Sequence, residues 1–597
     1  MARALAAVLV AVSASAAAQT APARPPPTST APRSAQSDAA PAQPPGDQSQ
    51  QDVDQKIEAA KKEIREEVRA QLATQSASQG WDEEFADQTR KLELLELDGY
   101  LRVRPDLFHK LDLNRNPDPS GFTLFPRPVS EKERTLAGVN MRARIEPTIN
   151  VSEEVRIKLQ IDALDNLVFG SSPAYATGSD RYEFGVMSNT QVPPSVLNSV
   201  RDSILVKRAY GEVSTPIGIL RFGRMGSHWG LGMVHNDGNC LDCDFGDTVD
   251  RIQFVTEPFT GWYLTPMLDF DVEGPISGSD AGQGQPFDLS NTDDSHSYIL
   301  AIARRDTEQQ ERARLDNGLS VLNYGIHFTY RAQSFDPVGL LDPANPLARQ
   351  SRHATIYIPD LWGKLEHKSF RLELEGAAVL GNVEAAVGPS DAQRVQQLTL
   401  RQFGAVGRGE YRFMEGQLRL GLEAGFASGD RAPGFGNRPA RKTGDPAGNP
   451  VPNDIDGRQY GQYPCGGGTC NDTSIRNFQF NRDFRPDLIL FRELLGGITD
   501  AVYAKPTLTY AVAEGFDVFG SVVGSGAVYT ESTPSGLSRW LGVEIDAGAR
   551  YETEDGFIAQ LQWGVLFPQN GLKNVTGVTL PPLDTAQVLR AIIGIKY

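Results

Sequence analysis

The sequence predicts an all-β protein, a transmembrane antiparallel β-barrel of about 18 strands, with 16 as the other possible number. Three observations predict this fold. A long hairpin at residues 136–170 alternates apolar and charged side chains, similar stretches recur as far as the C-terminus, and the connections between them are short and long in turn. This rhythm is typical of strands that cross a bilayer around a wet lumen.

The hairpin at residues 136–170 carries the clearest pattern. In its second arm Ile157 and Leu159 alternate with Arg156 and Lys158, and the first arm alternates in the same way. A period of two gives each strand one apolar and one charged face. A strand in a soluble sandwich is usually about 5 or 6 residues long. A tilted strand that crosses a bilayer needs roughly 9 to 11 residues, and the arms are long enough for that.

The N-terminus has the form of a secretory signal peptide. Residues 1–18 contain one basic residue, Arg3, then an apolar stretch from Ala4 to Val12 and small residues that suit a cleavage site. The alternative, a membrane anchor, is disfavoured because the apolar stretch is too short to span a bilayer. The chain is therefore expected to be exported.

Two further segments precede the barrel. Residues 19–51 are rich in Pro, Ala and Gln and are expected to form a disordered periplasmic linker. Within residues 52–80, apolar side chains from Val53 to Leu72 recur every three or four positions, which predicts an amphipathic helix. This helix is either a short coiled coil that joins copies or reaches the cell wall, or a single marginal helix.

The barrel itself is expected to occupy residues 90–597. Every short connection falls on one side of the predicted sheet, as transmembrane barrels require. Pro147, Pro359 and Pro506 lie inside proposed strands and are expected to mark bulges or strand ends. The proposed strands are 95–108, the two arms of 136–170, 204–213, 217–225, 249–256, 262–273, 297–306, 321–335, 353–366, 370–380, 398–413, 417–429, 501–512, 516–528, 539–551, 557–567 and 587–597.

Aromatic residues near the predicted strand ends are expected to form the girdles that mark the two membrane interfaces. They are Trp262, Tyr263, Trp540, Tyr551, Phe557 and Phe567.

Composition excludes two other classes of protein. No run of 18 apolar residues follows the signal peptide, which argues against a helical membrane protein. The net charge of −17 makes the chain a poor partner for nucleic acid. Nothing in the sequence calls for a cofactor.

The four cysteines form two local pairs, Cys240 with Cys243 and Cys465 with Cys470. In an oxidising compartment each pair is expected to form a loop disulfide. Zinc is the rival interpretation, but the second spacing is wrong for it and no histidine stands nearby. A redox-active pair is disfavoured because Cys240 does not open a helix that could lower the pKa of a thiol.

The loop around Cys240 is rich in aspartate. Its carboxylates are suitable calcium ligands, but their spacing fits no known calcium loop, so a solvated acidic loop is the expectation and no metal site is predicted. The aspartates are Asp237, Asp242, Asp244, Asp247 and Asp250.

Charged residues at inward positions are unevenly distributed. Basic residues come from the first five strands and acidic residues from later ones, so a basic wall should face acidic ones across a channel. The alternative is that these charges only keep the lumen wet. The candidate pore-lining residues are Arg102, Arg104, Arg142, Arg144, Arg156, Lys158, Arg221, Asp269, Asp271, Glu373, Glu375, Glu423, Glu544 and Asp546.

The C-terminal residue is Tyr597, with Ile595 and Ile593 on the same face behind it. Together with the signal peptide and the strand rhythm, this ending resembles bacterial outer-membrane porins of the general or sugar-channel type. The resemblance implies an outer-membrane location, lipid and small hydrophilic solutes as partners, and recognition of the last strand by the insertion machinery. In such proteins an outside loop often narrows the pore. The candidate is 430–497, with Arg431, Arg438, Arg441 and Lys442.

Passive diffusion of small hydrophilic solutes is therefore the expected function. The alternative is a structural anchor or surface protein without transport activity. A membrane hydrolase is disfavoured, because the only adjacent candidates are Ser227-His228 and Asp294-Ser295-His296, and no nucleophile elbow is present. No catalytic residue is predicted.

Overall fold

The structure, a computed structural model, describes residues 94–115, 124–125, 134–169, 204–272, 294–337, 349–386, 395–431, 434–435, 462–465, 468–471, 474–573 and 582–597. The expected signal peptide (1–18), linker (19–51) and helix (52–80) lie outside the described residues, so they stay predictions.

Eighteen long strands, β1–β13 and β17–β21, form one antiparallel ring in chain order. The strand number predicted from the sequence is confirmed, and each proposed strand is present. The strands are β1 (Leu95–His109), β2 (Thr135–Asn150), β3 (Val155–Val168), β4 (Ile204–Thr215), β5 (Gly218–Gly226), β6 (Thr248–Phe259), β7 (Trp262–Val272), β8 (Ser295–Arg304), β9 (Val321–Pro337), β10 (Arg349–His367), β11 (Phe370–Ala386), β12 (Val395–Phe413), β13 (Leu418–Ala427), β17 (Ala501–Ala513), β18 (Phe516–Ala527), β19 (Trp540–Glu552), β20 (Phe557–Pro568) and β21 (Ala586–Lys596).

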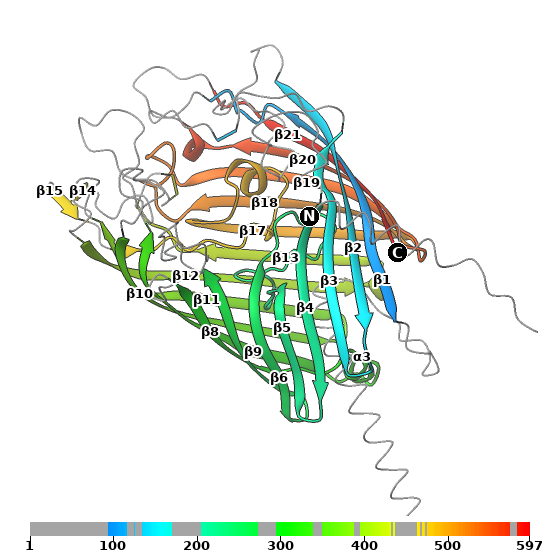
Figure 1. Ribbon diagram of the computed structural model, residues 1–597. Helices are drawn as coiled ribbons and strands as arrows, with labels where there is room; N and C mark the ends of the chain where they lie inside the picture. The colour runs from blue at the N-terminus through cyan, green and yellow to red at the C-terminus, as the bar shows by residue number, and fades with distance from the viewer. Residues whose placement is uncertain are drawn as a thin grey trace, which may run out of the picture. The chain divides into compact units, whose positions relative to one another are not determined.

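The ring is closed by its first and last strands. β21 pairs antiparallel with β1, so that Tyr100 lies opposite Lys596 and His109 lies opposite Gln587. Figure 1 shows β1 running beside β21. Closure leaves no free edge within this ring of described strands.

Short elements lie in the connections. They are α3 (Glu308–Asp316), η3 (Met414–Gly416), β14 (Gln462–Cys465), β15 (Gly468–Asn471), β16 (Ser474–Ile475), η4 (Leu490–Leu494) and η5 (Asn570–Leu572). β14 and β15 form a hairpin, and β16 pairs parallel with β12. Among the described residues, no helix has the length and apolarity needed to cross a membrane.

The two faces of each strand are opposite in polarity to those of a soluble protein. In β1, Leu101 is 42% exposed whereas Arg102 is fully buried. Apolar side chains cover the outer face around the ring, among them Leu361, Leu374, Leu422, Val502, Leu561 and Ile593. An apolar exterior of this extent requires a lipid surround, so the chain forms a transmembrane barrel.

The three strand prolines correct one expectation, because they mark neither strand ends nor bulges. Pro147 keeps its register opposite Leu97 in β1, while the ladder from β2 to β3 has no pair at that position. Pro359 and Pro506 show the same one-sided gap, toward β11 and β18. A proline without an N–H thus interrupts the ladder on one side and leaves the strand intact.

Five of the six predicted girdle residues face outward near strand ends, and their place at the membrane interfaces stays a prediction. Trp262, Trp540, Tyr551, Phe557 and Phe567 have exposed side chains near strand ends. The prediction was wrong for Tyr263, which is 6% exposed. Tyr263 follows Trp262 in β7, and consecutive strand residues point to opposite faces.

Candidate functional site

Two connections fold into the ring of strands. Residues 227–247, which join β5 to β6, are named the disulfide loop; residues 476–500, which join β16 to β17, are named the apolar segment. The disulfide loop contacts Arg142 of β2 and Glu375 of β11. These strands stand on opposite sides of the ring, so the loop crosses the lumen.

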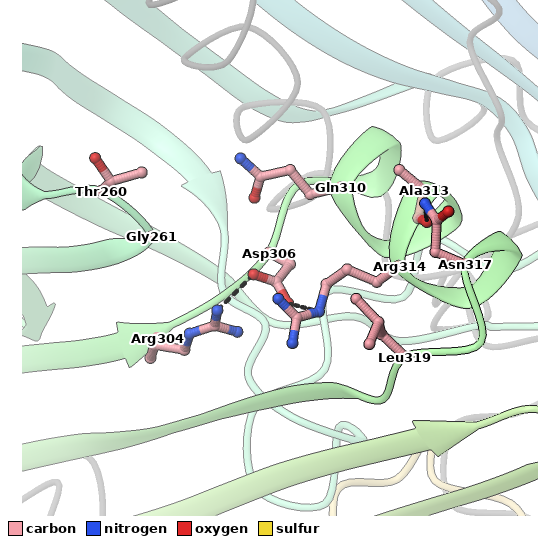
Figure 2. Close-up of a pocket in the computed structure, with 9 residues that line it drawn as sticks. All are labelled: Thr260, Gly261, Arg304, Asp306, Gln310, Ala313, Arg314, Asn317 and Leu319. Atoms are coloured by element: carbon pink, nitrogen blue, oxygen red, sulfur yellow. Dashed lines mark hydrogen bonds and ion pairs between the residues drawn. The ribbon is translucent and has the colours of Figure 1, made fainter.

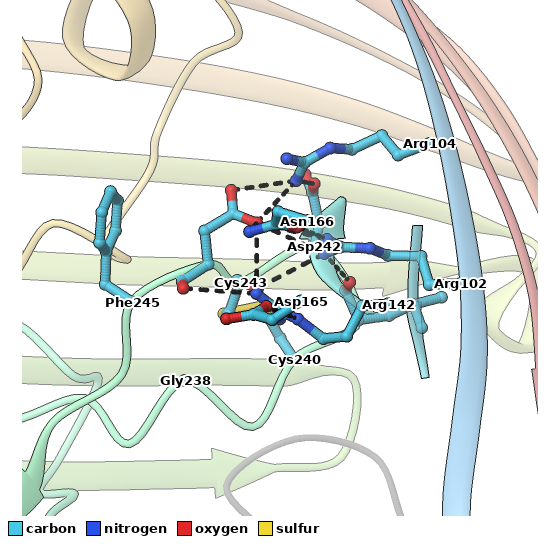
Figure 3. Close-up of polar contacts among 12 residues, drawn as sticks. Arg102, Arg104, Arg142, Asp165, Asn166, Gly238, Cys240, Asp242, Cys243 and Phe245 are labelled. Carbon is cyan, nitrogen blue, oxygen red and sulfur yellow. Dashed lines mark hydrogen bonds and ion pairs between the residues drawn. A yellow bond between two sulfur atoms is a disulfide. The ribbon is translucent and has the colours of Figure 1, made fainter. Parts of the chain in front are cut away.

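Arginines of β1 and β2 bind one end of the disulfide loop (Figure 3). Arg102 Nη1 donates to the carbonyl oxygen of Leu241 at 2.8 Å, and Arg142 Nη1 donates to that of Cys243 at 2.8 Å. Arg104 Nη1 lies 3.0 Å from Asp244 Oδ2. The three guanidinium groups are almost completely buried, so each contact is made away from bulk water.

Two aspartates of the loop lie among these arginines. Asp242 is bound by Arg492 of the apolar segment, with Nη1 to Oδ2 at 2.6 Å, and by Arg104 at 3.0 Å. Burial alone would raise the pKa of Asp244, but Arg104 and Arg485 outweigh it and hold that pKa well below its usual range. Both carboxylates are therefore ionised and act as counter-ions of the arginine cluster.

The acidic wall binds backbone N–H groups of the inserted segments. Glu375 accepts hydrogen bonds from the amides of Leu231 and Met233, the latter at 3.1 Å. Glu544 of β19 accepts hydrogen bonds from three successive amides of the apolar segment, Leu488, Ile489 and Leu490, at 2.8–3.0 Å. A buried carboxylate is stabilised when several N–H donors converge on it.

Asp483 joins the two inserted segments. Its carboxylate accepts from the amides of Asp244 (3.0 Å), Phe245 (3.0 Å) and Gly246 (2.6 Å) of the disulfide loop. Arg485, two residues further along the apolar segment, donates to the carbonyl oxygen of Asp242 at 2.8 Å. The segments therefore support each other inside the lumen.

The turn at the start of the disulfide loop packs against aromatic residues of the barrel wall. The ring of Trp229 lies 6.4 Å from that of Trp362 in β10 and 5.5 Å from that of His327 in β9. The guanidinium carbon of Arg305 lies 4.6 Å from the centre of the Trp362 ring, a cation–π contact. These aromatic contacts lie across the ring from the arginine cluster.

The apolar segment carries a core inside the barrel. Its Phe480, Ile489 and Phe491 are each 1% exposed or less. They belong to one buried cluster with Leu566 of β20 and Val588 of β21. Burial and the nearby Asp546 raise the pKa of Asp487, in the same segment. Part of the lumen is thus packed like a protein interior.

Two glycines allow the disulfide loop to turn. Gly238 and Gly246 have φ angles of +68° and +72°, and a Cβ atom on Gly246 would lie 2.5 Å from the carbonyl oxygen of Asp237. Only glycine adopts this conformation at such a close approach without strain.

The structure places the fourteen candidate pore-lining residues on the inner face. Arg102, Arg104, Arg142, Arg144, Arg221, Asp269, Glu373, Glu375, Glu423, Glu544 and Asp546 are buried, and Arg156, Lys158 and Asp271 are half-buried. Many bind wall neighbours, as in the pairs Arg221–Glu212 (2.9 Å) and Asp269–Arg251 (2.5 Å). Others bind the inserted segments. That they line a conducting pore stays a prediction.

Most partners of these wall residues were not predicted from the sequence. The Asp-rich loop was expected to be solvated, but Asp237 and Asp244 are 5% and 7% exposed. The missed residues are Asp162, Asp165 and Asn166 of β3 and Asp483, Arg485 and Arg492 of the apolar segment. One signal for the contact between loop and wall was the number of acidic residues in a loop predicted to lie inside a basic wall.

The cysteine predictions are confirmed for one pair, the Cys240–Cys243 disulfide. The side chains of Cys465 and Cys470 lie outside the described residues. In the candidate stretch 430–497, residues 476–497 enter the lumen. Among its proposed cations Arg431 packs over the ring of Tyr529, and Arg438, Arg441 and Lys442 lie outside the described residues.

A separate cavity of about 390 Å³ lies at the short-connection end, beside α3. Figure 2 shows Arg304 and Arg314 directed toward Asp306 there. Arg304 Nη2 lies 2.6 Å from Asp306 Oδ1, and Arg314 Nε lies 3.6 Å from Asp306 Oδ2. The helix begins with a capping box, in which Thr307 Oγ1 accepts from the amide of Gln310.

The serines of the two candidate hydrolase pairs contact arginines. Ser227 Oγ accepts from Arg251 Nη2 at 3.1 Å, and Ser295 Oγ accepts from Arg331 Nε at 3.0 Å. Within the described ranges, no group of three or more His, Cys, Asp or Glu side chains is arranged to hold a metal ion.

The closed ring and its inserted segments define a porin-like transmembrane barrel. No protein-family model matches the chain, and no curated protein sequence does.

Solved structures share the strand arrangement only loosely. The outer membrane protein OpdK from Pseudomonas aeruginosa is 9% identical, with 84% of this chain and 99% of that chain covered and a TM-score of 0.41. A BenF-like porin from Pseudomonas fluorescens Pf-5 is 9% identical, with 84% and 98% covered and a TM-score of 0.41. OmpT, an outer membrane protein of Vibrio cholerae, is 9% identical, with 84% and 99% covered and a TM-score of 0.32. At such identities and TM-scores the likeness carries no argument about function.

Proposed function

We propose that the protein is an outer-membrane channel for passive diffusion of small hydrophilic solutes, and that it is not an enzyme. The closed ring of 18 strands supports this most directly, because a barrel of that size is too wide for its own strand side chains to fill. The charged inner face and the loop that crosses the lumen suit a narrowed, water-filled path.

The proposal assigns the fourteen inward charged residues to the wall of that path. Arg156 and Lys158 are half-buried on β3 near the short turn at 151–154, where water can reach them. We also propose that the insertion machinery binds the C-terminal strand. The N-terminal helix would bind other copies of the chain or the cell wall.

A structural anchor without transport is the second candidate. The apolar cluster inside the barrel favours it, because residues such as Phe480 and Ile489 exclude water from part of the lumen. The two candidates differ in whether a continuous aqueous path passes the inserted segments.

Swelling of proteoliposomes separates the two. Vesicles that contain the refolded full-length protein are diluted into an isosmotic solution of a neutral monosaccharide, and light scattering is followed. A channel gives swelling that slows as the sugar becomes larger; a sealed anchor gives the rate of protein-free vesicles. Heat-denatured protein is the control for leakage.

A further inference from the structure

The Cys240–Cys243 disulfide closes a small ring of chain that lies against the arginine cluster. Three successive carbonyl oxygens of this ring accept hydrogen bonds at 2.8 Å from three arginines. Arg102 of β1 binds that of Leu241, Arg485 of the apolar segment binds that of Asp242, and Arg142 of β2 binds that of Cys243. The donors come from three different elements.

The three carbonyl groups point in directions that let all three arginines bind at the same time. A disulfide between residues three apart restricts the backbone of Leu241 and Asp242, so it holds the carbonyl oxygens in that arrangement. The side chains of Asp242 and Asp244 add ion pairs to Arg492 and Arg104 at the same place. The ring is therefore the point at which the loop is attached to the basic wall.

The two cysteines differ in how deeply the residues are buried. Cys243 is 5% exposed, whereas Cys240 is half-buried. A thiolate from solution would therefore attack Cys240 Sγ, and the bond to Cys243 Sγ would break with Cys243 leaving as a thiolate. Arg142 and Arg102 both donate to the carbonyl oxygen of Cys243, so positive charge lies next to the leaving group.

We propose that the Cys240–Cys243 disulfide is a redox-sensitive latch: reduction by a small thiol frees the disulfide loop from the arginine cluster and widens the lumen. A dithiol completes the reaction by displacing Cys240 from the mixed disulfide. It becomes a cyclic disulfide, and the two cysteines take up two protons. The effect on conductance rests on the proposed channel function, whereas the release of the loop does not.

The test uses the full-length protein with and without dithiothreitol, and it reads three quantities. Alkylation with mass spectrometry reports which cysteines are reduced, hydrogen exchange reports the amides of residues 238–246, and planar bilayers report single-channel conductance. The paired substitution Cys240→Ser with Cys243→Ser removes the latch. The matched control, Cys465→Ser with Cys470→Ser, removes the other cysteine pair and leaves the latch.

We expect dithiothreitol to increase exchange at residues 238–246 and to raise conductance by about twofold or more in the wild type and in the control. The latch variant should show high exchange and high conductance without dithiothreitol, and dithiothreitol should change neither. The proposal is overturned if Cys240 and Cys243 resist reduction, or if they are reduced and the loop amides stay protected. A protein that conducts in no state refutes the channel, while hydrogen exchange still decides the latch.

Discussion

Arg104 Nη1 of the barrel wall lies 3.0 Å from Asp244 Oδ2 of the disulfide loop, and the two side chains are 4% and 6% exposed. This ion pair joins residues that are far apart in the sequence and fixes the loop across the lumen. Arg102 and Arg485 approach the same carboxylate at 3.5 Å and 3.0 Å. Asp244 is therefore the carboxylate on which the attachment of the loop most depends.

Asp244→Asn should release this end of the loop. Removing one partner of a buried ion pair typically costs about 3–5 kcal/mol, because the remaining charges are left uncompensated. The open form of the loop should then be at least about a hundredfold more populated, and limited proteolysis within residues 238–246 should accelerate in proportion.

Asp250→Asn is the matched control for that substitution. Asp250 pairs with Arg224, but their side chains are 46% and 55% exposed. An exposed ion pair contributes about 0–1 kcal/mol. Equal cleavage rates in the two variants would show that burial of the Asp244 pair is irrelevant to the loop.

Asp483→Asn should loosen the contact between the disulfide loop and the apolar segment. The substitution removes the negative charge and one of the two oxygens that accept from the amides of Asp244, Phe245 and Gly246. Each buried amide left without an acceptor costs about 1–3 kcal/mol. Hydrogen exchange should rise at residues 244–246 and stay unchanged at the turn around Trp229. Uniform loss of protection along the whole chain would argue instead for a general folding defect.

Gly246→Ala should destabilise the loop by steric overlap as well as by backbone strain. The new Cβ would lie 2.5 Å from the carbonyl oxygen of Asp237. Gly318 has a similar φ of +70° with nothing within 4 Å of its Cβ position, so Gly318→Ala carries the backbone strain alone, about 1 kcal/mol. Thermal unfolding in detergent should therefore show a clearly larger loss for position 246. Equal losses at the two sites would contradict the close approach.

The stability of the protein should depend on pH through His235 in a defined direction. Burial lowers the pKa of His235 to about 4, from an ordinary value of 6.5. The unfolded chain takes up a proton below pH 6.5, whereas the folded chain takes it up only near pH 4. Between these values the unfolded state binds more protons, so the free energy of unfolding falls as the pH decreases, by up to about 1.4 kcal/mol per pH unit.

His235→Gln removes this contribution. The difference in unfolding free energy between wild type and variant should be constant above pH 6.5 and should shift against the wild type as the pH falls toward 4. Urea unfolding followed by tryptophan fluorescence measures it. His353→Gln, at a side chain 61% exposed, is the control for replacing a histidine outside the buried loop. A pH-independent difference at position 235 would contradict the buried, neutral imidazole.

The ring of strands could be predicted from the sequence because it depends on local pattern. Alternation places Leu101 outside and Arg102 inside whatever the rest of the chain does, and strand closure follows from the number of such strands. The same alternation predicted that the fourteen charged candidates point inward.

The inserted segments could not be predicted in this way, because their positions depend on long-range pairs. Nothing near Asp242 in the sequence shows that Arg104 and Arg492 will surround it, so the loop had the composition of a solvated one. The apolar segment did carry a signal. Phe478, Phe480 and the run from Leu488 to Phe491 are too apolar for a connection in water.

Single-channel conductance of the full-length protein in planar bilayers, measured with a salt gradient, tests the central claim most directly. The channel proposal predicts discrete steps of conductance with a reversal potential that changes when the half-buried Arg156 and Lys158 are both replaced by glutamine. Folding is checked on the same sample by the heat-dependent mobility of the barrel on gels. A correctly folded barrel that gives no conductance steps would contradict the channel and leave the structural anchor.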